Sequence, residues 1–431
     1  MDLQDGDRER FSTYIGTLAS VIGRRDRAGH LRDYCTGLLM PAERKSVEPI
    51  AAMVAPASTA ARHQSLLHFV GNAGWSDEAV LAKVRECALP SLEKQAPITG
   101  WIVDDTGFPK KGTESVGVAR QYCGQRGKQD NCQVAVSLSL ANAHGSLPVA
   151  FRLYMPEQWI ADTERREKTG VPDAVVFKTK PEIALEQIRA AYAAGLPRGT
   201  VLADVAYGAS TKFRKGISAL GLRYAAAVGA GTAVWTTAVA PSPEVRGRGR
   251  RRAARPDRHE SYVRLSVEDL ARALPSDEWQ TIEWREGVAG ALQSRFARLR
   301  VRIAQGQRAK PGRSPEEWLL IEWPEGEAEP SGFWLSTLDE DIAFTDFVDR
   351  VKLRWRIERD YLELKQEVGL GQYEVRGWRG FHHHATLCIA AYGFLVRERA
   401  AFPPSAARSR AVLAGFAVPD GYRPRGAAGP H

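Results

Sequence analysis

The order of strand-like and helix-like segments after Ile98 constrains this fold more than any other feature of the sequence. An apolar run at residues 101–106 and two alternating segments at 133–140 and 147–154 predict three antiparallel strands. Helix-like and strand-like segments then alternate, at residues 180–194, 201–204, 210–220 and 223–228. This order predicts an α/β fold in which helices cover a mixed sheet.

Further regions flank and interrupt this predicted core. The first 95 residues carry apolar side chains at helical spacing, which predicts an N-terminal helical domain that could bind DNA or could serve only for packing. After residue 230 the pattern becomes that of a β-rich insertion, and helix returns near residue 341. The last stretch is rich in Pro, Ala, Arg and Gly, which is typical of a disordered tail. The predicted domains are 1–95, 96–230, 231–340, 341–400 and 401–431.

The charge of the chain indicates nucleic acid as a partner. Its 431 residues include 60 Lys and Arg against 51 Asp and Glu, which gives a net charge of +9. Arginine supplies much of this excess, and its planar guanidinium binds phosphate oxygens in pairs. A basic protein with no nucleic acid partner is the alternative.

Cysteine content and hydropathy argue against several classes of protein. The five cysteines include no Cys-x-x-Cys pair, so neither a zinc site nor a disulfide framework is indicated. The acidic N-terminus has no apolar segment typical of a signal peptide, and the longest apolar run, at residues 385–396, is too short to span a bilayer. We therefore expect a cytoplasmic protein that is associated with the nucleoid and not with a membrane.

Two aspartates stand at the ends of predicted strands. Asp104 ends the first strand, and Asp204 ends the strand at residues 201–204. Ligand sites of α/β sheets gather at strand ends. Asp105 competes with Asp104 for such a site, but alternation sends the two side chains to opposite faces, and we choose Asp104. Asp204 could instead cap the turn or helix that follows it.

A third carboxylate, Glu358, lies in a segment with helical periodicity. The segment from about Thr345 to Leu370 has apolar residues three and four apart, which predicts one helix. These residues are Phe347, Val348, Val351, Trp355 and Leu362. Arg354, Glu358 and Tyr361 would then share a stripe, with Lys365 further along. Taken alone, this stripe could be a surface ladder of ion pairs.

Three carboxylates that meet in space would repel one another unless cations lie among them. A small set of oxygen ligands favours Mg²⁺, which keeps waters and accepts substrate phosphates as further ligands. We therefore predict that Asp104, Asp204 and Glu358 bind metal and catalyse attack on a phosphodiester. The run His382–His384 resembles a metal site, but successive side chains on a helix point apart, which favours structural or DNA-facing histidines.

Two basic segments could contact the DNA backbone. In the first, Arg298, Arg300 and Arg302 alternate with Leu299, Val301 and Ile303, which predicts a strand with one basic face. The second, residues 244–259, holds seven arginines among Gly, Ala and Pro, including Arg250, Arg251 and Arg252, and predicts a mobile loop. A merely solvated surface is the alternative for both.

Taken in order, these motifs resemble those of insertion-sequence transposases of the DDE superfamily. The last motif of one branch reads Tyr-x-x-Arg-x-x-x-Glu-x-x-x-x-x-x-Lys, and it falls here on Arg354, Glu358 and Lys365, with Val351 at the tyrosine position. The first motif matches Asp104-Asp105-Thr106, and the second matches Asp204 within Leu202–Gly208. The resemblance also includes residues 117–124 and 378–384 and covers about residues 30–398.

The resemblance implies a ribonuclease-H-like catalytic core, interrupted by the β-rich insertion, and dependence on Mg²⁺, for which Mn²⁺ can substitute. It implies cut-and-paste transposition, in which transposon ends are cut and their 3′-hydroxyls are joined to a target. The implied partners are double-stranded DNA, as terminal inverted repeats and target, and a second copy of the chain. Arg354 and Lys365 would contact DNA near the cleaved end. The alternatives are a domesticated DNA-binding protein that no longer cuts and a ribonuclease-H-type nuclease without strand transfer.

Overall fold

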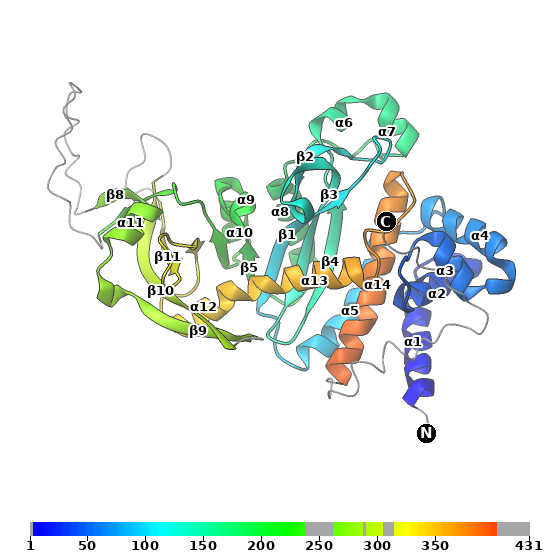
Figure 1. The fold of residues 1–431 in the computed structure, drawn as a ribbon, viewed down its shortest axis with the longest axis horizontal. Helices are drawn as coiled ribbons and strands as arrows, with labels where there is room; N and C mark the ends of the chain where they lie inside the picture. The colour runs from blue at the N-terminus through cyan, green and yellow to red at the C-terminus, as the bar shows by residue number, and fades with distance from the viewer. Residues whose placement is uncertain (1–2, 238–261, 288–289, 305–313, 403–431) are drawn as a thin grey trace, which may run out of the picture. The chain divides into compact units, whose positions relative to one another are not determined.

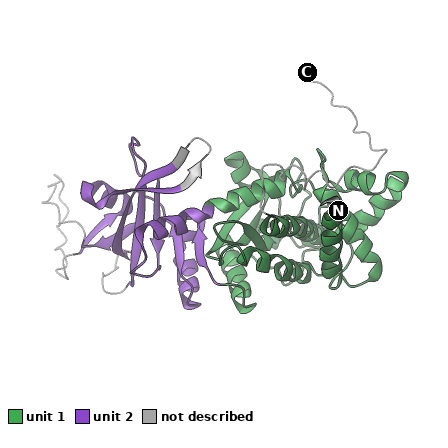
Figure 2. Cartoon of the chain, turned by 90° about the horizontal axis from the view of Figure 1, so that it is seen from below, with its two compact units in different colours: residues 1–197, 355–431 green, residues 198–354 purple. Residues whose placement is uncertain are grey.

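The computed structural model describes residues 3–237, 262–287, 290–304 and 314–402. The chain divides into two compact units (Figure 2): unit 1 comprises residues 1–197 and 355–431, and unit 2 comprises residues 198–354. The predicted basic loop with Arg250, Arg251 and Arg252, and the predicted tail beyond residue 402, lie outside the described residues. The domain limits drawn from the sequence remain predictions.

The N-terminal part of unit 1 is helical, as predicted. It forms α1 (Leu3–Ala19), α2 (Arg25–Leu39), α3 (Val47–Val54), α4 (Thr59–Gly71) and α5 (Asp77–Glu93). The N-cap of α5 is Ser76, whose side chain accepts a hydrogen bond from the Ala79 amide at 3.1 Å. The long helix α14 (Trp378–Ala401) packs against α5 and α2 (Figure 1). The helical segment is thereby joined to the end of the described chain through a shared apolar core.

The strands of unit 1 confirm the predicted antiparallel unit. They are β1 (Gly100–Pro109), β2 (Ala119–Cys123), β3 (Lys128–Ala141) and β4 (Ser146–Leu153), and β3 pairs antiparallel with each of the other three. The sequence patterns did not reveal β2, because it is short and only Ala119 and Cys123 within it are buried. Helix α8 (Lys180–Ala193) begins at the predicted position and bonds to β3, since Gln187 Nε2 donates to the Val136 carbonyl at 3.0 Å. Two short helices, α6 (Glu157–Ala161) and α7 (Thr163–Thr169), precede it.

The first strand is longer than predicted. The sequence suggested that the first strand ends at Asp104, but β1 continues to Pro109 in register with β3. A Cβ atom at Gly107 would lie 2.7 Å from Cys123 Sγ, so this glycine permits close approach of β2 and does not mark a turn. Asp104 therefore lies within β1 and not at its end.

Unit 2 contains a mixed sheet. Its elements in chain order are β5 (Thr200–Ala203), α9 (Val205–Gly208), α10 (Thr211–Ala219), β6 (Tyr224–Ala227), β7 (Ala233–Thr236), β8 (Val263–Ser266), α11 (Val267–Ala273), β9 (Gln280–Gly287), β10 (Gly290–Ile303), β11 (Glu316–Trp323), β12 (Gly332–Ser336) and α12 (Phe344–Lys352). The strands follow the order β5-β6-β12-β11-β10-β7-β8, and β9 also pairs with β10. β5 and β6 run parallel, whereas the other pairs are antiparallel.

The single helix predicted from Thr345 to Leu370 is wrong. Helix α12 ends at Lys352, a 3₁₀ turn covers Leu353–Trp355, and α13 (Arg356–Gln366) follows. Leu362, which was expected on the apolar face, is 52% exposed. The buried apolar residues of α13 are instead Ile357, Tyr361 and Leu364, which also recur three and four apart. The 3₁₀ turn coincides with the passage of the chain from unit 2 to unit 1.

Candidate functional site

Asp104 and its neighbour Asp105 differ in their partners. Asp104 Oδ1 accepts a hydrogen bond from the Asp105 amide at 2.7 Å. The Asp105 carboxylate forms an ion pair with Lys180 at the start of α8, where Oδ2 and Nζ are 2.7 Å apart. Asp105 is thus held by a cation, and the choice of Asp104 as the metal ligand remains a prediction.

Asp204, the second predicted carboxylate, lies in unit 2 directly before α9. Its Oδ1 accepts hydrogen bonds from the amides of Ala206 at 2.9 Å and Tyr207 at 3.4 Å, so it caps α9 as the sequence allowed. Its Oδ2 lies 3.9 Å from Nη2 of Arg354. One carboxylate oxygen thus fixes the turn, and the other faces a cation.

The turn after Asp204 is held tightly against β6. A Cβ atom at Gly208 would lie 2.0 Å from the Ala227 carbonyl oxygen, so only glycine fits there without movement of the backbone. The buried guanidinium of Arg214 donates to the Gly208 carbonyl. These contacts fix the backbone that carries Asp204 and so limit the directions its carboxylate can take.

Glu358 lies in the first turn of α13 and is exposed. The helix that carries it is attached to β3, because the hydroxyls of Tyr361 and Ser137 are 2.8 Å apart. Ser137 is the β3 partner of Asp104 in the strand register. This bond therefore fastens α13 to the β1–β3 strand pair, which carries Asp104. Tyr361 lies about one helical turn from Glu358.

Asp360 is a residue of this helix that the sequence patterns missed. It is fully buried, and its Oδ1 accepts hydrogen bonds from Ser146 at 2.5 Å and from Tyr392 at 2.9 Å. Burial raises the pKa of Asp360 to about 6. Its spacing, three residues after Ile357 and one before Tyr361, was the available signal, because it places an acid on the buried face.

Lys365 also reaches β1. Its ammonium donates to the Gly107 carbonyl at 2.8 Å and to Gln125 Oε1 at 3.2 Å, and it lies 5.1 Å from the centre of the Phe108 ring. Burial lowers the pKa of Lys365 to about 8. In this structure the lysine anchors β1, and its predicted contact with DNA remains a prediction.

The structure thus groups the predicted residues by unit. Asp104, Glu358 and Lys365 belong to unit 1, whereas Asp204 and Arg354 belong to unit 2. Within the described residues, no three His, Cys, Asp or Glu side chains lie together as a metal-binding group. The convergence of the three carboxylates therefore remains a prediction from the sequence.

Comparison with known proteins decides the family. A family model described as DDE superfamily endonuclease matches residues 17–291. The chain belongs to this family. The matched residues include Asp104 and Asp204 and end before Glu358. The predicted fold class is confirmed as well, since this family is consistent with a ribonuclease-H-like α/β fold carrying a β-rich insertion.

One relative carries a more specific description. The chain is 33% identical over 193 residues to a protein described as "Probable transposase for insertion sequence element IS701" from Microchaete diplosiphon. The alignment covers 44% of this chain and 46% of the relative, so the similarity spans about half of each protein.

The predicted basic strand is part of β10 and has the predicted alternation, but its arginines already have partners within the protein. Leu299, Val301 and Ile303 are buried, and the three arginines between and before them are partly buried. Arg298 donates to the Ile342 carbonyl at 2.6 Å, Arg300 pairs with Glu340 at 3.2 Å, and Arg302 donates to the Ser314 carbonyl at 2.8 Å. Binding of DNA by these arginines stays a prediction, and it would have to compete with these contacts.

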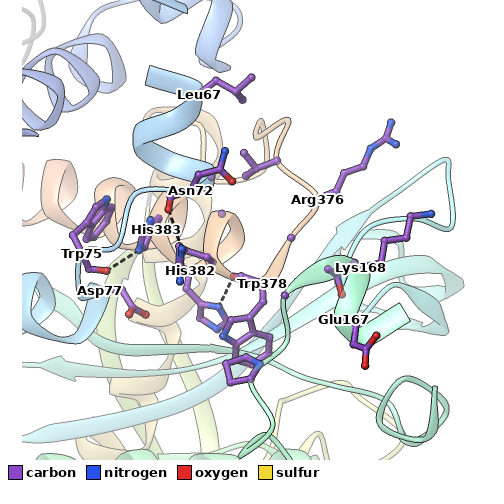
Figure 3. A pocket seen from close by; sticks show the side chains of 18 residues that line it. Leu67, Asn72, Trp75, Asp77, Glu167, Lys168, Arg376, Trp378, His382 and His383 are labelled. Carbon is purple, nitrogen blue, oxygen red and sulfur yellow. Dashed lines mark hydrogen bonds between the residues drawn. The ribbon is translucent and has the colours of Figure 1, made fainter. Parts of the chain in front are cut away.

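The histidine run is buried and hydrogen-bonded, which fits the structural one of the two roles that the sequence left open. His382 Nδ1 lies 2.9 Å from the Trp378 carbonyl, and His383 lies 3.0 Å from the Trp75 carbonyl (Figure 3). The other ring nitrogen of His383 lies 2.9 Å from the Val70 carbonyl. His384 bonds to the Tyr34 hydroxyl at 2.9 Å. Burial lowers the pKa of His383 and of His384 to about 4, so both rings are neutral near pH 7.

Figure 3 also shows a cavity beside this run, with a volume of about 640 Å³. It is lined by the ends of α4 and α7 and by the start of α14. Neither Asp104 nor Glu358 lines it. The cavity therefore lies apart from the candidate carboxylates of unit 1.

The helices of the described residues include none with the length and apolar character that a membrane span needs.

Proposed function

We propose that this protein is a DNA transposase of an insertion sequence, which cuts transposon ends and joins their 3′-hydroxyls to target DNA in a cut-and-paste reaction. The observation that carries the proposal is membership of the DDE superfamily endonuclease family together with similarity to a probable transposase for an insertion sequence. The net charge of +9 suits a partner with a phosphate backbone. We assign its site of action to the cytoplasm, on the DNA of the nucleoid.

The proposed metal ligands are Asp104, Asp204 and Glu358. Their chemistry fits Mg²⁺ or Mn²⁺, because carboxylate oxygens are the ligands that such hard cations take, with waters completing the shell. The pairing of Asp105 with Lys180 supports the choice of Asp104, and the fixed turn at Gly208 gives Asp204 a defined direction. Bound metal ions supply activation of the attacking oxygen and stabilisation of the leaving oxygen.

The residues around these carboxylates would hold the DNA. Arg354 faces Asp204 at 3.9 Å and can also bind a phosphate, so it would place a strand next to this carboxylate. Lys365, which donates to the Gly107 carbonyl, would bind a phosphate near this point of β1, three residues after Asp104. We propose double-stranded terminal repeats and target DNA as substrates, bound by two copies of the chain so that both ends are held together.

Cleavage of the flanking DNA by purified protein tests the proposal. Duplexes carrying the ends of the element are incubated with and without Mg²⁺, and the cut positions are mapped. We expect Asp104→Asn, Asp204→Asn and Glu358→Gln to abolish cutting while DNA binding persists. Asp105→Asn is the matched control, since this neighbouring carboxylate is paired with Lys180 and should be dispensable for the chemistry.

Three outcomes would change the assignment. Cutting by Glu358→Gln protein would remove Glu358 from the site. DNA binding without any cutting by the unaltered protein would favour a domesticated DNA-binding protein. Cutting without joining of pre-cut ends to a target would favour a nuclease of the ribonuclease-H type.

A further inference from the structure

Unit 1 carries a basic surface that includes none of the residues proposed above to bind metal or DNA. It lies on the β2–β3 hairpin and on the loop after β1, and we call it the hairpin surface. Its members are Lys110, Lys111, Arg120 and Tyr122, and all except the partly buried Lys110 are exposed. Arg120 and Tyr122 lie on one face of β2, and the Lys110 amide donates to the carbonyl of Asn131, the β3 partner of Arg120.

Within the part of the chain that the structure describes, the cations of the hairpin surface form no ion pairs. Among the described residues, none of these three Lys and Arg side chains has a carboxylate oxygen within 4.0 Å. The neighbouring Arg126, by contrast, pairs with Asp130 at 3.8 Å. Three positive charges that have no acidic partner in the described part of the chain create a potential that attracts an anionic chain.

Hydrogen bonds hold this surface in place. Asn131 Nδ2 on β3 donates to the Lys110 carbonyl at 2.7 Å and to the Gly112 carbonyl at 3.0 Å, which ties the loop after β1 to the hairpin. Lys365 joins the hairpin to β1 through its bonds to Gln125 and Gly107. The ammonium of Lys110 lies 3.7 Å from the centre of the Tyr373 ring. The cations are therefore presented on a fixed framework and not on a free loop.

Tyr122 adds an aromatic ring to this charged surface. Its side chain is 59% exposed, which is unusual for a large aromatic residue, and it lies two residues from Arg120 on the same face of β2. Its partner on β3, Gln129, is exposed as well. An exposed ring among cations suits a single nucleic acid strand, because an unpaired base can stack on the ring while its phosphates meet the cations.

We propose that the hairpin surface binds a single strand of DNA, with Arg120 and the lysines after β1 at its phosphates and Tyr122 stacked on a base. The choice of DNA rests on the proposed function and deepens it. The surface adjoins β1, and Lys365 contacts β1 three residues after Asp104, so the bound strand would lead toward the strand that carries this carboxylate.

Binding of a fluorescein-labelled oligothymidylate to the full chain, in EDTA, tests this proposal separately from cleavage. The double variant Lys111→Gln, Arg120→Gln is compared with Lys94→Gln, Arg189→Gln, which removes two exposed cations of unit 1 from the end of α5 and from α8. We expect the first variant to reduce the steepness of the plot of log binding constant against log salt concentration by about 1.4, which is about 0.7 for each phosphate that is no longer bound. The control variant should keep the slope of the unaltered protein.

The aromatic contact is tested with Tyr122→Ala and Tyr122→Phe. Loss of one stacked base should weaken binding by about fivefold or more, and phenylalanine should restore it, because stacking needs the ring and not the hydroxyl. A duplex of the same length should lose little affinity with Tyr122→Ala. Equal salt slopes in the two double variants, or unchanged binding by Tyr122→Ala, would overturn the proposal. Because no metal is present, these results stand whether or not the protein cuts DNA.

Discussion

Nη2 of Arg354 lies 3.9 Å from Oδ2 of Asp204, so a residue assigned to DNA and a residue assigned to metal face each other in unit 2. An arginine at this distance competes with any cation that approaches the carboxylate. We therefore expect Arg354→Gln to bind Mn²⁺ several-fold more tightly than the unaltered protein, and to bind DNA more weakly. Metal binding is measured by titration calorimetry, and DNA binding is measured by fluorescence anisotropy.

The control for this prediction is Lys215→Gln, which removes an exposed cation of α10 in the same unit. It lowers the net charge equally, and metal affinity should not change. Equal metal affinity in the Arg354→Gln and unaltered proteins would show that the arginine does not govern access to Asp204.

A second prediction concerns the backbone of the Asp204 turn. Gly208→Ala places a Cβ atom 2.0 Å from the Ala227 carbonyl oxygen, so either the turn or β6 must move. We expect the free energy of unfolding to fall by about 1–3 kcal/mol, which is typical of overpacking. Gly231→Ala in the same unit is the control, since a Cβ atom there meets nothing within 4 Å. Denaturant unfolding of the two variants side by side measures the difference, and equal stability would mean that the turn relaxes at little cost.

The sequence predicted the local elements that carry the candidate residues because each motif is local. The strand of Asp104, the turn of Asp204 and the helix of Glu358 each follow from periodicity within a few residues. Residue spacing could not show that β1 continues past Gly107, because that depends on β3 and on the close approach of Cys123. Nor could it show the pairing of Asp105 with Lys180, which lies 75 residues away in the chain. The missed features thus depend on tertiary contacts.

The break in the predicted helix around Glu358 has the same origin. Apolar spacing over Phe347–Trp355 and over Ile357–Leu364 is helical in both stretches, yet the chain changes from one unit to the other between them. A periodicity count cannot detect a unit boundary that falls inside a continuous pattern.

A third prediction uses the buried acid of α13. The pKa of Asp360 is raised by burial to about 6, above the ordinary value of 3.8, so the folded state binds its proton more tightly than the unfolded state does. The resulting stabilisation is complete below pH 3.8 and is lost as the pH rises through about 6. Asp360→Asn should remove this loss, which amounts to about 2–3 kcal/mol by pH 8.

Denaturant unfolding between pH 4 and pH 8 measures this effect as the difference between Asp360→Asn and the unaltered protein. Asp173→Asn, which alters an exposed carboxylate, serves as the control. A difference that does not change with pH would mean that Asp360 titrates normally, and its burial would then have to be compensated by the hydroxyls of Ser146 and Tyr392.

The last prediction links Lys365 to the pH dependence of DNA binding. Burial lowers the pKa of this ammonium to about 8, so its charge is present at pH 7 and is largely lost by pH 9. If the lysine contacts phosphate as proposed, affinity for DNA should fall across this range. Lys365→Gln should bind more weakly at pH 7 and show a shallower fall, with anisotropy in EDTA as the measurement.

The pKa of Lys110 is also lowered to about 8 by burial, so Lys110→Gln is measured beside it. Each single variant should retain the part of the pH dependence that comes from the other lysine, and the double variant should retain little. An unaltered pH profile in Lys365→Gln would confine this lysine to its role at the Gly107 carbonyl, where it anchors β1, and would leave phosphate binding to Arg354 and to the exposed cations of the β2–β3 hairpin.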